Sequence, residues 1–160
     1  MLQMTASTST DPVTDPVTDP LPDRRAPAPP RNAPPALVVE LASAEDFSRL
    51  VERQALRCRR DRQGLSVLRL QLQFDSEPDE ALRLQLLAEC ARRLCSRVRA
   101  SDCVARWQAT HFGVLLPRCE PAQAEAVLAR LTRFAGGNYR LGERLLHLRV
   151  QGHVLGRLDP

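Results

Sequence analysis

Residues 101–116 read Ser-Asp-Cys-Val-Ala-Arg-Trp-Gln-Ala-Thr-His-Phe-Gly-Val-Leu-Leu, and Pro117 follows them. Two short apolar runs, 103–107 and 112–116, flank the polar residues 108–111. Apolar runs joined by a short polar segment are typical of an antiparallel hairpin. The stretch therefore predicts two adjacent strands joined by a four-residue turn. The other predicted elements can be arranged around this hairpin.

The segment before the hairpin predicts a helix, a strand and a second helix. Ser43 is a candidate N-cap, and apolar residues then recur at helical spacing until near Gly64. Residues 65–74 alternate between apolar and polar side chains, as in a half-buried strand. Pro78 is expected to open the second helix. The expected buried positions are Phe47, Leu50, Val51 and Ala55 in the first helix, and Leu84, Leu87, Cys90 or Ala91, Leu94 and Val98 in the second.

The segment after the hairpin predicts a third helix and a last strand. Pro121 begins the helix and Gly136-Gly137 ends it, and the strand runs from about Leu145 to Val154. Without the first helix the order is βαββαβ, which is the ferredoxin-like α+β arrangement of an antiparallel sheet with helices packed on one face. The inward positions are expected to be Ala124, Val127, Leu128, Leu131 and Phe134 in the helix, and Leu146, Leu148 and Val150 in the strand.

Composition divides the chain into a tail, residues 1–36, and a domain, residues 37–160. Nine of the 13 prolines fall in the first region, and large apolar residues are sparse there, so we expect a disordered Pro-rich tail. The net charge is +4, and every basic residue other than His is Arg. These arginines are interspersed with acidic residues along the helices, which favours solvated faces over a nucleic-acid surface. The five cysteines form no C-x-x-C pair, so neither a zinc site nor a disulfide framework is predicted.

The hairpin also carries a longer pattern. The pattern is Arg-x-x-Asp-x-Val-Ala-Arg-x-(five residues)-x-Val-Leu-Leu-Pro, and Phe112 is the last of the five residues. It is matched by Arg99, Asp102, the run 104–106, Phe112 and the run 114–117. This pattern resembles the signature of the GGDEF family, whose members make the bacterial second messenger cyclic di-GMP. The resemblance covers about residues 42–156 and implies the palm-like fold of nucleotidyl cyclases.

The resemblance also shows what this chain lacks. Where the family has Gly-Gly-Asp/Glu-Glu-Phe, the sequence has Gln108, Ala109, Thr110, His111 and Phe112. The family's Asp-x-Asp-x-Phe at the end of the first strand is replaced by Leu-Gln-Leu-Gln-Phe, residues 70–74. The family's guanine-binding loop and its leading Asp-x-Leu-Thr-Gly-Leu segment are also absent. Mg²⁺ prefers carboxylates to neutral hydroxyl, amide and imidazole groups. We therefore expect no Mg²⁺ binding, no other cofactor and no catalytic residue.

One family element is retained. Arg99 and Asp102 match the Arg-x-x-Asp of the family's inhibitory site, which binds cyclic di-GMP, and Arg130 is placed as the additional arginine of that site. The alternative is structural: Arg99 would stabilise a helix C-terminus and Asp102 would cap a turn. His111 is interpreted as a solvated turn residue, Trp107 as a hairpin or surface contact, and Phe112 as core.

Three functions follow in order of preference. The first is a non-catalytic receptor that binds cyclic di-GMP. The second is a nucleotide-independent scaffold that binds a protein partner through the tail or the hairpin, and the third is an active diguanylate cyclase. The first residues of the sequence do not have the pattern of a signal peptide, and no run of apolar residues is long enough for a membrane span. A cytoplasmic protein is therefore expected. A homodimer stays open.

Overall fold

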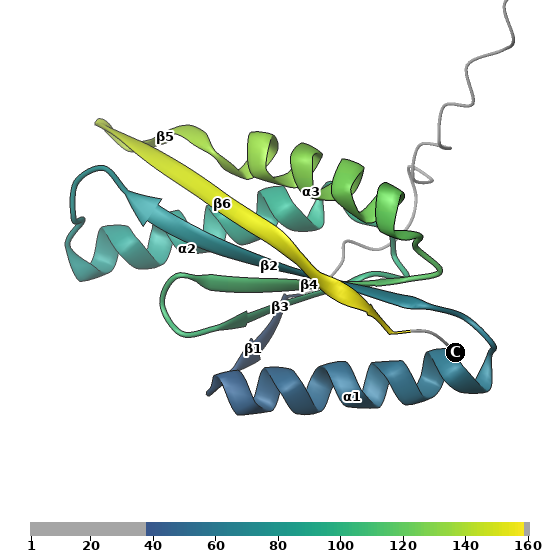
Figure 1. Ribbon diagram of the computed structural model, residues 1–160. Helices are drawn as coiled ribbons and strands as arrows, with labels where there is room; N and C mark the ends of the chain where they lie inside the picture. The colour runs from purple at the N-terminus through teal and green to yellow at the C-terminus, as the bar shows by residue number, and fades with distance from the viewer. Residues whose placement is uncertain (1–37, 159–160) are drawn as a thin grey trace, which may run out of the picture.

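The computed structural model describes residues 38–158, and the predicted tail, residues 1–36, lies outside them. A six-stranded sheet and three helices make up this region (Figure 1). In chain order the elements are β1 Val38–Leu41, α1 Ala44–Arg60, β2 Leu65–Phe74, α2 Glu80–Cys95, β3 Cys103–Trp107, β4 His111–Pro117, α3 Pro121–Ala135, β5 Gly137–Leu141 and β6 Arg144–Leu158. The mixed α+β architecture predicted from the periodicity is confirmed.

The sheet has the ferredoxin-like strand order at its centre. Its full order is β1-β3-β4-β2-β6-β5. Within the run β3-β4-β2-β6, each strand pairs antiparallel with the next. Strand β1 pairs with β3 in parallel. The predicted strand at residues 65–74 has the same bounds as β2, which lies between β4 and β6.

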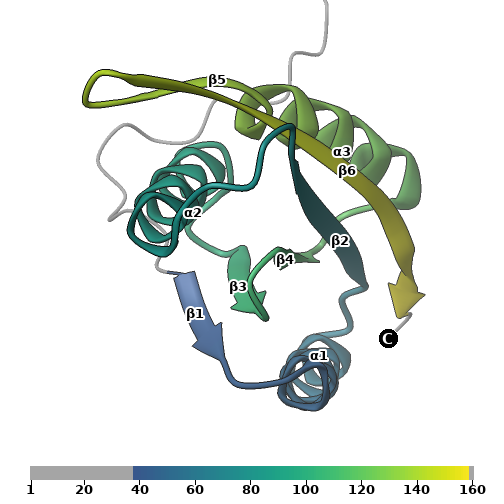
Figure 2. The same ribbon diagram turned by 90° about the vertical axis from the view of Figure 1, so that its left-hand side faces the viewer.

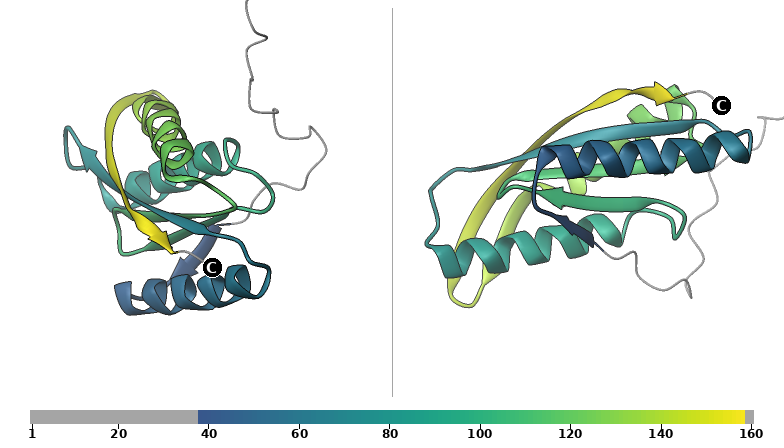
Figure 3. Two further views of the ribbon diagram at one scale, coloured as in Figure 1. Left: turned by 45° about the vertical axis from the view of Figure 1, so that its right-hand side comes forward. Right: turned by 90° about the horizontal axis from the view of Figure 1, so that it is seen from below.

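Helices cover both faces of the sheet. α2 and α3 lie on one face and α1 on the other (Figure 2), and α1 lies in front of the sheet when the molecule is seen from below (Figure 3, right). The α2–α3 side contains the larger core, which includes Leu68, Leu70 and Phe112. The α1 side contains a smaller core with Phe47 and Trp107. Because α1 packs against its first half, β2 is buried on both faces there and half-buried farther on.

The helices differ in detail from the prediction. α1 ends at Arg60 rather than near Gly64, and α2 begins at Glu80 with Asp79 as N-cap rather than at Pro78. Leu84 is 53% exposed, so its expected inward position is wrong, and Leu86 is buried instead. Phe134 was also expected inside, but it is 38% exposed, and its ring packs against the Arg97 guanidinium rather than in the core. Val98 is buried beyond the end of α2, and Arg99 lies in the loop after that helix.

Two strands and the length of the turn also differ. β1 and β5 were not predicted, and β6 extends from Arg144 to Leu158. The polar turn contains three residues rather than four, because His111 already belongs to β4 and pairs with Trp107 across the hairpin. Phe112 is fully buried, as predicted. No helix within residues 38–158 is long and apolar enough to cross a membrane.

Candidate functional sites at the two ends of strand β3

The hairpin is held against α1 by an aromatic stack. The rings of Phe47 and Trp107 are 4.1 Å apart between centroids and inclined by 16°. Gly113 lies beneath this stack: a Cβ added there would be 2.2 Å from Phe47 Cε2 and 3.0 Å from Trp107 Cζ3. This packing fixes β3 and β4 relative to α1, and it positions both candidate sites because each lies at one end of β3.

The turn of residues 108–110 has the backbone conformation that a glycine favours. Gln108 has a φ of 61°, in the left-handed region where a side chain is strained. The family motif has glycine at this position. The turn therefore keeps a glycine-like conformation with a glutamine in it.

The turn lies beside the end of β2. The Leu72 N–H donates to the Thr110 carbonyl oxygen over 2.9 Å, and His111 pairs with Gln71 in the ladder. The resemblance places metal-binding carboxylates in this turn and at the end of this strand. The side chains at those positions here are the Thr110 hydroxyl, the His111 imidazole and the apolar Leu70 and Leu72. Burial, and to a lesser extent the charge of Arg69, lower the pKa of His111. Within residues 38–158 no three His, Cys, Asp or Glu side chains gather in a way that could hold a metal ion.

A cavity of about 320 Å³ opens beside this turn, between β1, α2 and the hairpin. Its charged side chains neutralise one another. Arg106 Nε lies 2.8 Å from Glu40 Oε2, and Arg83 pairs with Glu80. Because both arginines are engaged by carboxylates, the cavity offers little net positive charge for a triphosphate.

The opposite end of β3 carries the Arg-x-x-Asp loop. The Arg99 backbone N–H donates to Asp102 Oδ2 over 2.8 Å, and the Asp102 N–H donates to the Arg99 carbonyl oxygen over 3.0 Å. Asp102 therefore closes a tight turn, as the structural alternative expected. One carboxylate oxygen holds the backbone, and the other is 3.4 Å from Ser101 Oγ.

Three arginines gather around this loop. Arg130 Nη2 donates to the Arg97 carbonyl oxygen over 3.0 Å, which ties α3 to the loop. Burial raises the pKa of Asp102, while the Arg99 N–H and the charges of Arg99 and Arg130 oppose that rise. The sequence-predicted residues Arg99, Asp102 and Arg130 thus lie in one region. We refer to Arg97, Arg99 and Arg130 as the arginine cluster; none of the three forms an ion pair with any residue of the described range 38–158.

Sequence reasoning missed two contributors. Arg97 joins the cluster through its carbonyl oxygen and places its guanidinium 3.4 Å from the centroid of the Phe134 ring. The sequence gives only a weak indication of this contact, because Arg97 and Phe134 lie far apart in the chain and meet only in the folded structure. Glu40, which engages Arg106, lies on the unpredicted strand β1, and four residues are too few for a clear period-two pattern.

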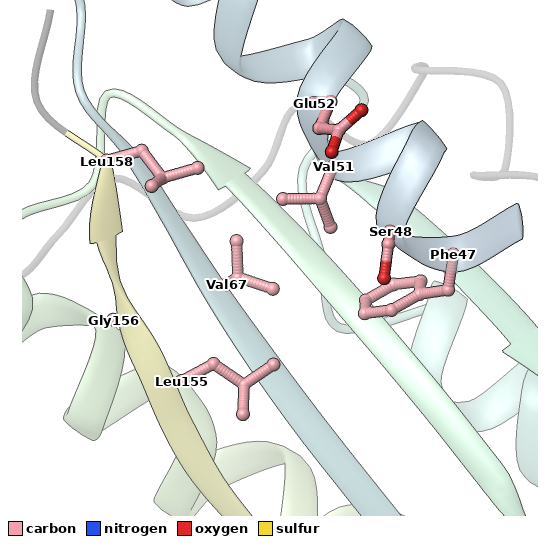
Figure 4. A pocket seen from close by; sticks show the side chains of 8 residues that line it. All are labelled: Phe47, Ser48, Val51, Glu52, Val67, Leu155, Gly156 and Leu158. Carbon is pink, nitrogen blue, oxygen red and sulfur yellow. The ribbon is translucent and has the colours of Figure 1, made fainter. Parts of the chain in front are cut away.

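A separate apolar groove of about 370 Å³ lies between α1 and the C-terminal end of β6 (Figure 4). Phe47 and Val51 of α1 face Val67 of β2 and the leucines Leu155 and Leu158 across it. Leu155 is 52% exposed. This groove lies on the α1 side of the sheet.

The fold and the hairpin first define a class: a ferredoxin-like α+β domain with an additional helix on the second face of its sheet. Residues 85–140, from α2 through the hairpin and α3 to β5, match the family model described as diguanylate cyclase, GGDEF domain. This part of the chain is similar to a GGDEF domain. No curated protein sequence matches it significantly.

Solved GGDEF structures share this fold. The GGDEF domain of FimX from Pseudomonas aeruginosa is 20% identical, with a TM-score of 0.57 over 74% of this chain and 76% of that one. A sensory box/GGDEF family protein from Caulobacter crescentus is 19% identical, with a TM-score of 0.58 over 71% and 78%. The diguanylate cyclase SiaD from P. aeruginosa, solved in complex with its activator SiaC, is 21% identical, with a TM-score of 0.55 over 70% of this chain and 45% of SiaD.

Proposed function

We propose that this domain is a degenerate, non-catalytic member of the GGDEF family that binds cyclic di-GMP through Arg99, Asp102 and Arg130. The observation that carries the proposal is the position of these three residues around one loop, with the two guanidinium groups free of ion pairs among residues 38–158. The domain would act in bacterial signalling as a receptor of the nucleotide.

The chemistry of the loop suits a guanine nucleotide with phosphodiester groups. A guanidinium is planar and donates two parallel hydrogen bonds, either to a phosphate or to the O6 and N7 acceptors of guanine. Asp102 keeps one oxygen on the Arg99 backbone and has a second oxygen that can accept from the guanine edge. Arg97, already over the Phe134 ring, adds positive charge beside the same loop.

The other end of β3 supports the lack of catalysis. Condensation of GTP requires metal-bound carboxylates to neutralise the triphosphate and help activate the attacking hydroxyl. Thr110 and His111 of the turn and Leu70 and Leu72 of β2 stand at those positions. The neighbouring arginines are engaged by Glu40 and Glu80. Incubation with GTP and Mg²⁺ followed by chromatography is expected to give no cyclic di-GMP; formation of product would contradict this part of the proposal.

Titration calorimetry with cyclic di-GMP tests the receptor function. We expect binding by the full chain and a loss of roughly 10–100-fold in affinity for Arg99→Ala, because a charge-assisted hydrogen bond contributes about 1.5–3 kcal/mol. Arg57→Ala, on the exposed side of α1, is the matched control and should bind as the wild type does. Absence of heat in the wild type, or equal binding by Arg99→Ala, would refute the proposal.

The alternative is a protein-interaction scaffold that needs no nucleotide. The apolar groove beside α1 favours it, because exposed leucines next to a hollow are a feature of interaction surfaces (Figure 4). Leu155→Asp would place a charge in this groove without touching the Arg-x-x-Asp loop. Under the alternative this variant loses its partner in a pull-down, whereas Arg99→Ala keeps it.

A further inference from the structure

The acidic stretch of the chain and the arginine cluster are complementary in charge. Residues 11–23 read Asp-Pro-Val-Thr-Asp-Pro-Val-Thr-Asp-Pro-Leu-Pro-Asp and contain no basic residue. Four aspartates thus recur at every fourth position, at 11, 15, 19 and 23.

The register of the sheet places the start of the described chain beside the Arg-x-x-Asp loop. β1 runs parallel to β3, and Val38 is the partner of Val104. Val104 follows Asp102 by two residues, so the chain enters the domain next to the loop that carries Arg99 and Asp102. Only 14 residues lie between Asp23 and Val38, and such a length spans at most about 50 Å when extended.

We propose that residues 11–23 of this chain dock on the arginine cluster of Arg97, Arg99 and Arg130 and compete with an anionic nucleotide for it. The competition with nucleotide rests on the proposed function, whereas the docking does not. Tethering supports the docking, because a short linker gives a local concentration in the millimolar range. Weak ionic contacts with three guanidinium groups that form no ion pair within residues 38–158 are then enough to populate the docked state.

Other basic surfaces are less suited to this segment. Arg57, Arg59 and Arg60 gather at the C-terminal end of α1, on the face of the sheet opposite α2 and α3. Arg149 of β6 is exposed, but its Nη2 is already 3.2 Å from Asp75 Oδ1. The arginine cluster combines proximity to Val38 with guanidinium groups that lack ion pairs within residues 38–158.

The test uses the full chain and its variant D11N/D15N/D19N/D23N. A matched control, E45Q/E52Q/E77Q/E143Q, changes the net charge by the same amount at carboxylates of the described domain that lie outside the Arg-x-x-Asp loop and α3. The arginine Nε–Hε resonances of the three proteins are compared by NMR at low and high salt, without nucleotide. We expect the tail variant to shift the Arg97, Arg99 and Arg130 signals at low salt and the control to leave them in place.

Calorimetry with cyclic di-GMP as the probe gives the second readout. Removal of a competing segment should tighten binding by roughly 3–10-fold in the tail variant at low salt, and the difference should vanish at 0.5 M NaCl. If neither protein binds cyclic di-GMP, the proposed function fails and the arginine resonances alone decide the docking. Unchanged arginine resonances, shifts at Arg57 or Arg149 instead, or equal nucleotide affinities in the two proteins would overturn the inference.

Discussion

The two ends of strand β3 differ in how their charges are used. At the turn end, Arg106 and Arg83 are bound by Glu40 and Glu80. At the loop end, Arg97, Arg99 and Arg130 have no ion pair among residues 38–158. One oxygen of Asp102 accepts from the Arg99 backbone N–H, and the other accepts from the Ser101 hydroxyl. Five residues separate the two sites.

Under the proposed function, one rigid frame keeps a recognition site at one end of β3 while the other end lacks the carboxylates of the family motif. The backbone at the turn retains its pairing with β2 and its left-handed residue at 108, so the loss there concerns side chains and not the fold. Under the proposed function, binding at the loop end requires only the side chains of Arg99, Asp102 and Arg130, with Arg97 beside them. Each of the following changes tests how far the two ends are independent.

The largest effect is expected where both ends share one support, at Gly113. A Cβ there would lie 2.2 Å from the Phe47 ring and 3.0 Å from Trp107, so Gly113→Ala should destabilise the domain by about 1–3 kcal/mol. Urea unfolding measures this change. In a Phe47→Ala background the ring is gone and the same substitution should cost much less; an equal cost in both backgrounds would contradict the steric explanation.

A medium effect separates the two residues of the Arg-x-x-Asp loop. Asp102→Ala removes the acceptor of the Arg99 N–H and should lower the free energy of unfolding by about 1 kcal/mol, whereas Arg99→Ala should leave it unchanged. Urea unfolding of the two variants checks this. Equal destabilisation would mean that the Arg99 side chain is structural, and the proposed division between a recognition arginine and a turn-closing aspartate would be wrong.

Periodicity predicted most of the frame and only part of the sites. It predicted the bounds of β2, the presence of the hairpin and of three helices, and the burial of Phe112. These features depend on the local spacing of apolar residues, which the sequence contains. It missed β1 and β5, which are short and exist through pairing with distant residues. It misplaced Phe134, whose ring packs against the Arg97 guanidinium rather than in the core.

The candidate sites show the same limit. The positions of Arg99, Asp102 and Arg130 came from a sequence pattern, and their closeness is a property of the loop and of α3 together. The ion pair of Glu40 with Arg106 could not be predicted, since it joins residues 66 positions apart through a strand that the sequence does not announce. Charge pairing between elements is therefore the part of a site that needs the structure.

A smaller effect is expected at the turn itself. Gln108 has a φ of 61°, which a residue with a Cβ adopts at a cost, so Gln108→Gly should stabilise the domain by about 0.5–1 kcal/mol. Ala109→Gly, next to it, does not relieve a left-handed conformation and should be neutral or destabilising. A loss of stability in Gln108→Gly would show that the glutamine side chain makes a contribution larger than the backbone strain.

The smallest effect concerns the protonation of His111. Burial and the Arg69 charge hold its pKa below the ordinary value of about 6.5, so the unfolded chain takes up this proton more readily than the folded one. The stability that His111 contributes is therefore fully present above the unfolded pKa and is lost as the pH falls through it toward the folded pKa.

Arg69→Gln separates the two causes of this shift. The pKa of His111, followed by NMR titration, should rise but stay below the ordinary value, because burial is the larger cause and remains. Arg140→Gln, the same charge change at an exposed position of β5, is the control. An unchanged pKa in Arg69→Gln would remove Arg69 as a cause. A rise would mean that a cationic neighbour helps to keep a neutral imidazole where the family places an acidic metal ligand, so that the turn end opposes a bound metal ion by charge as well as by its lack of carboxylates.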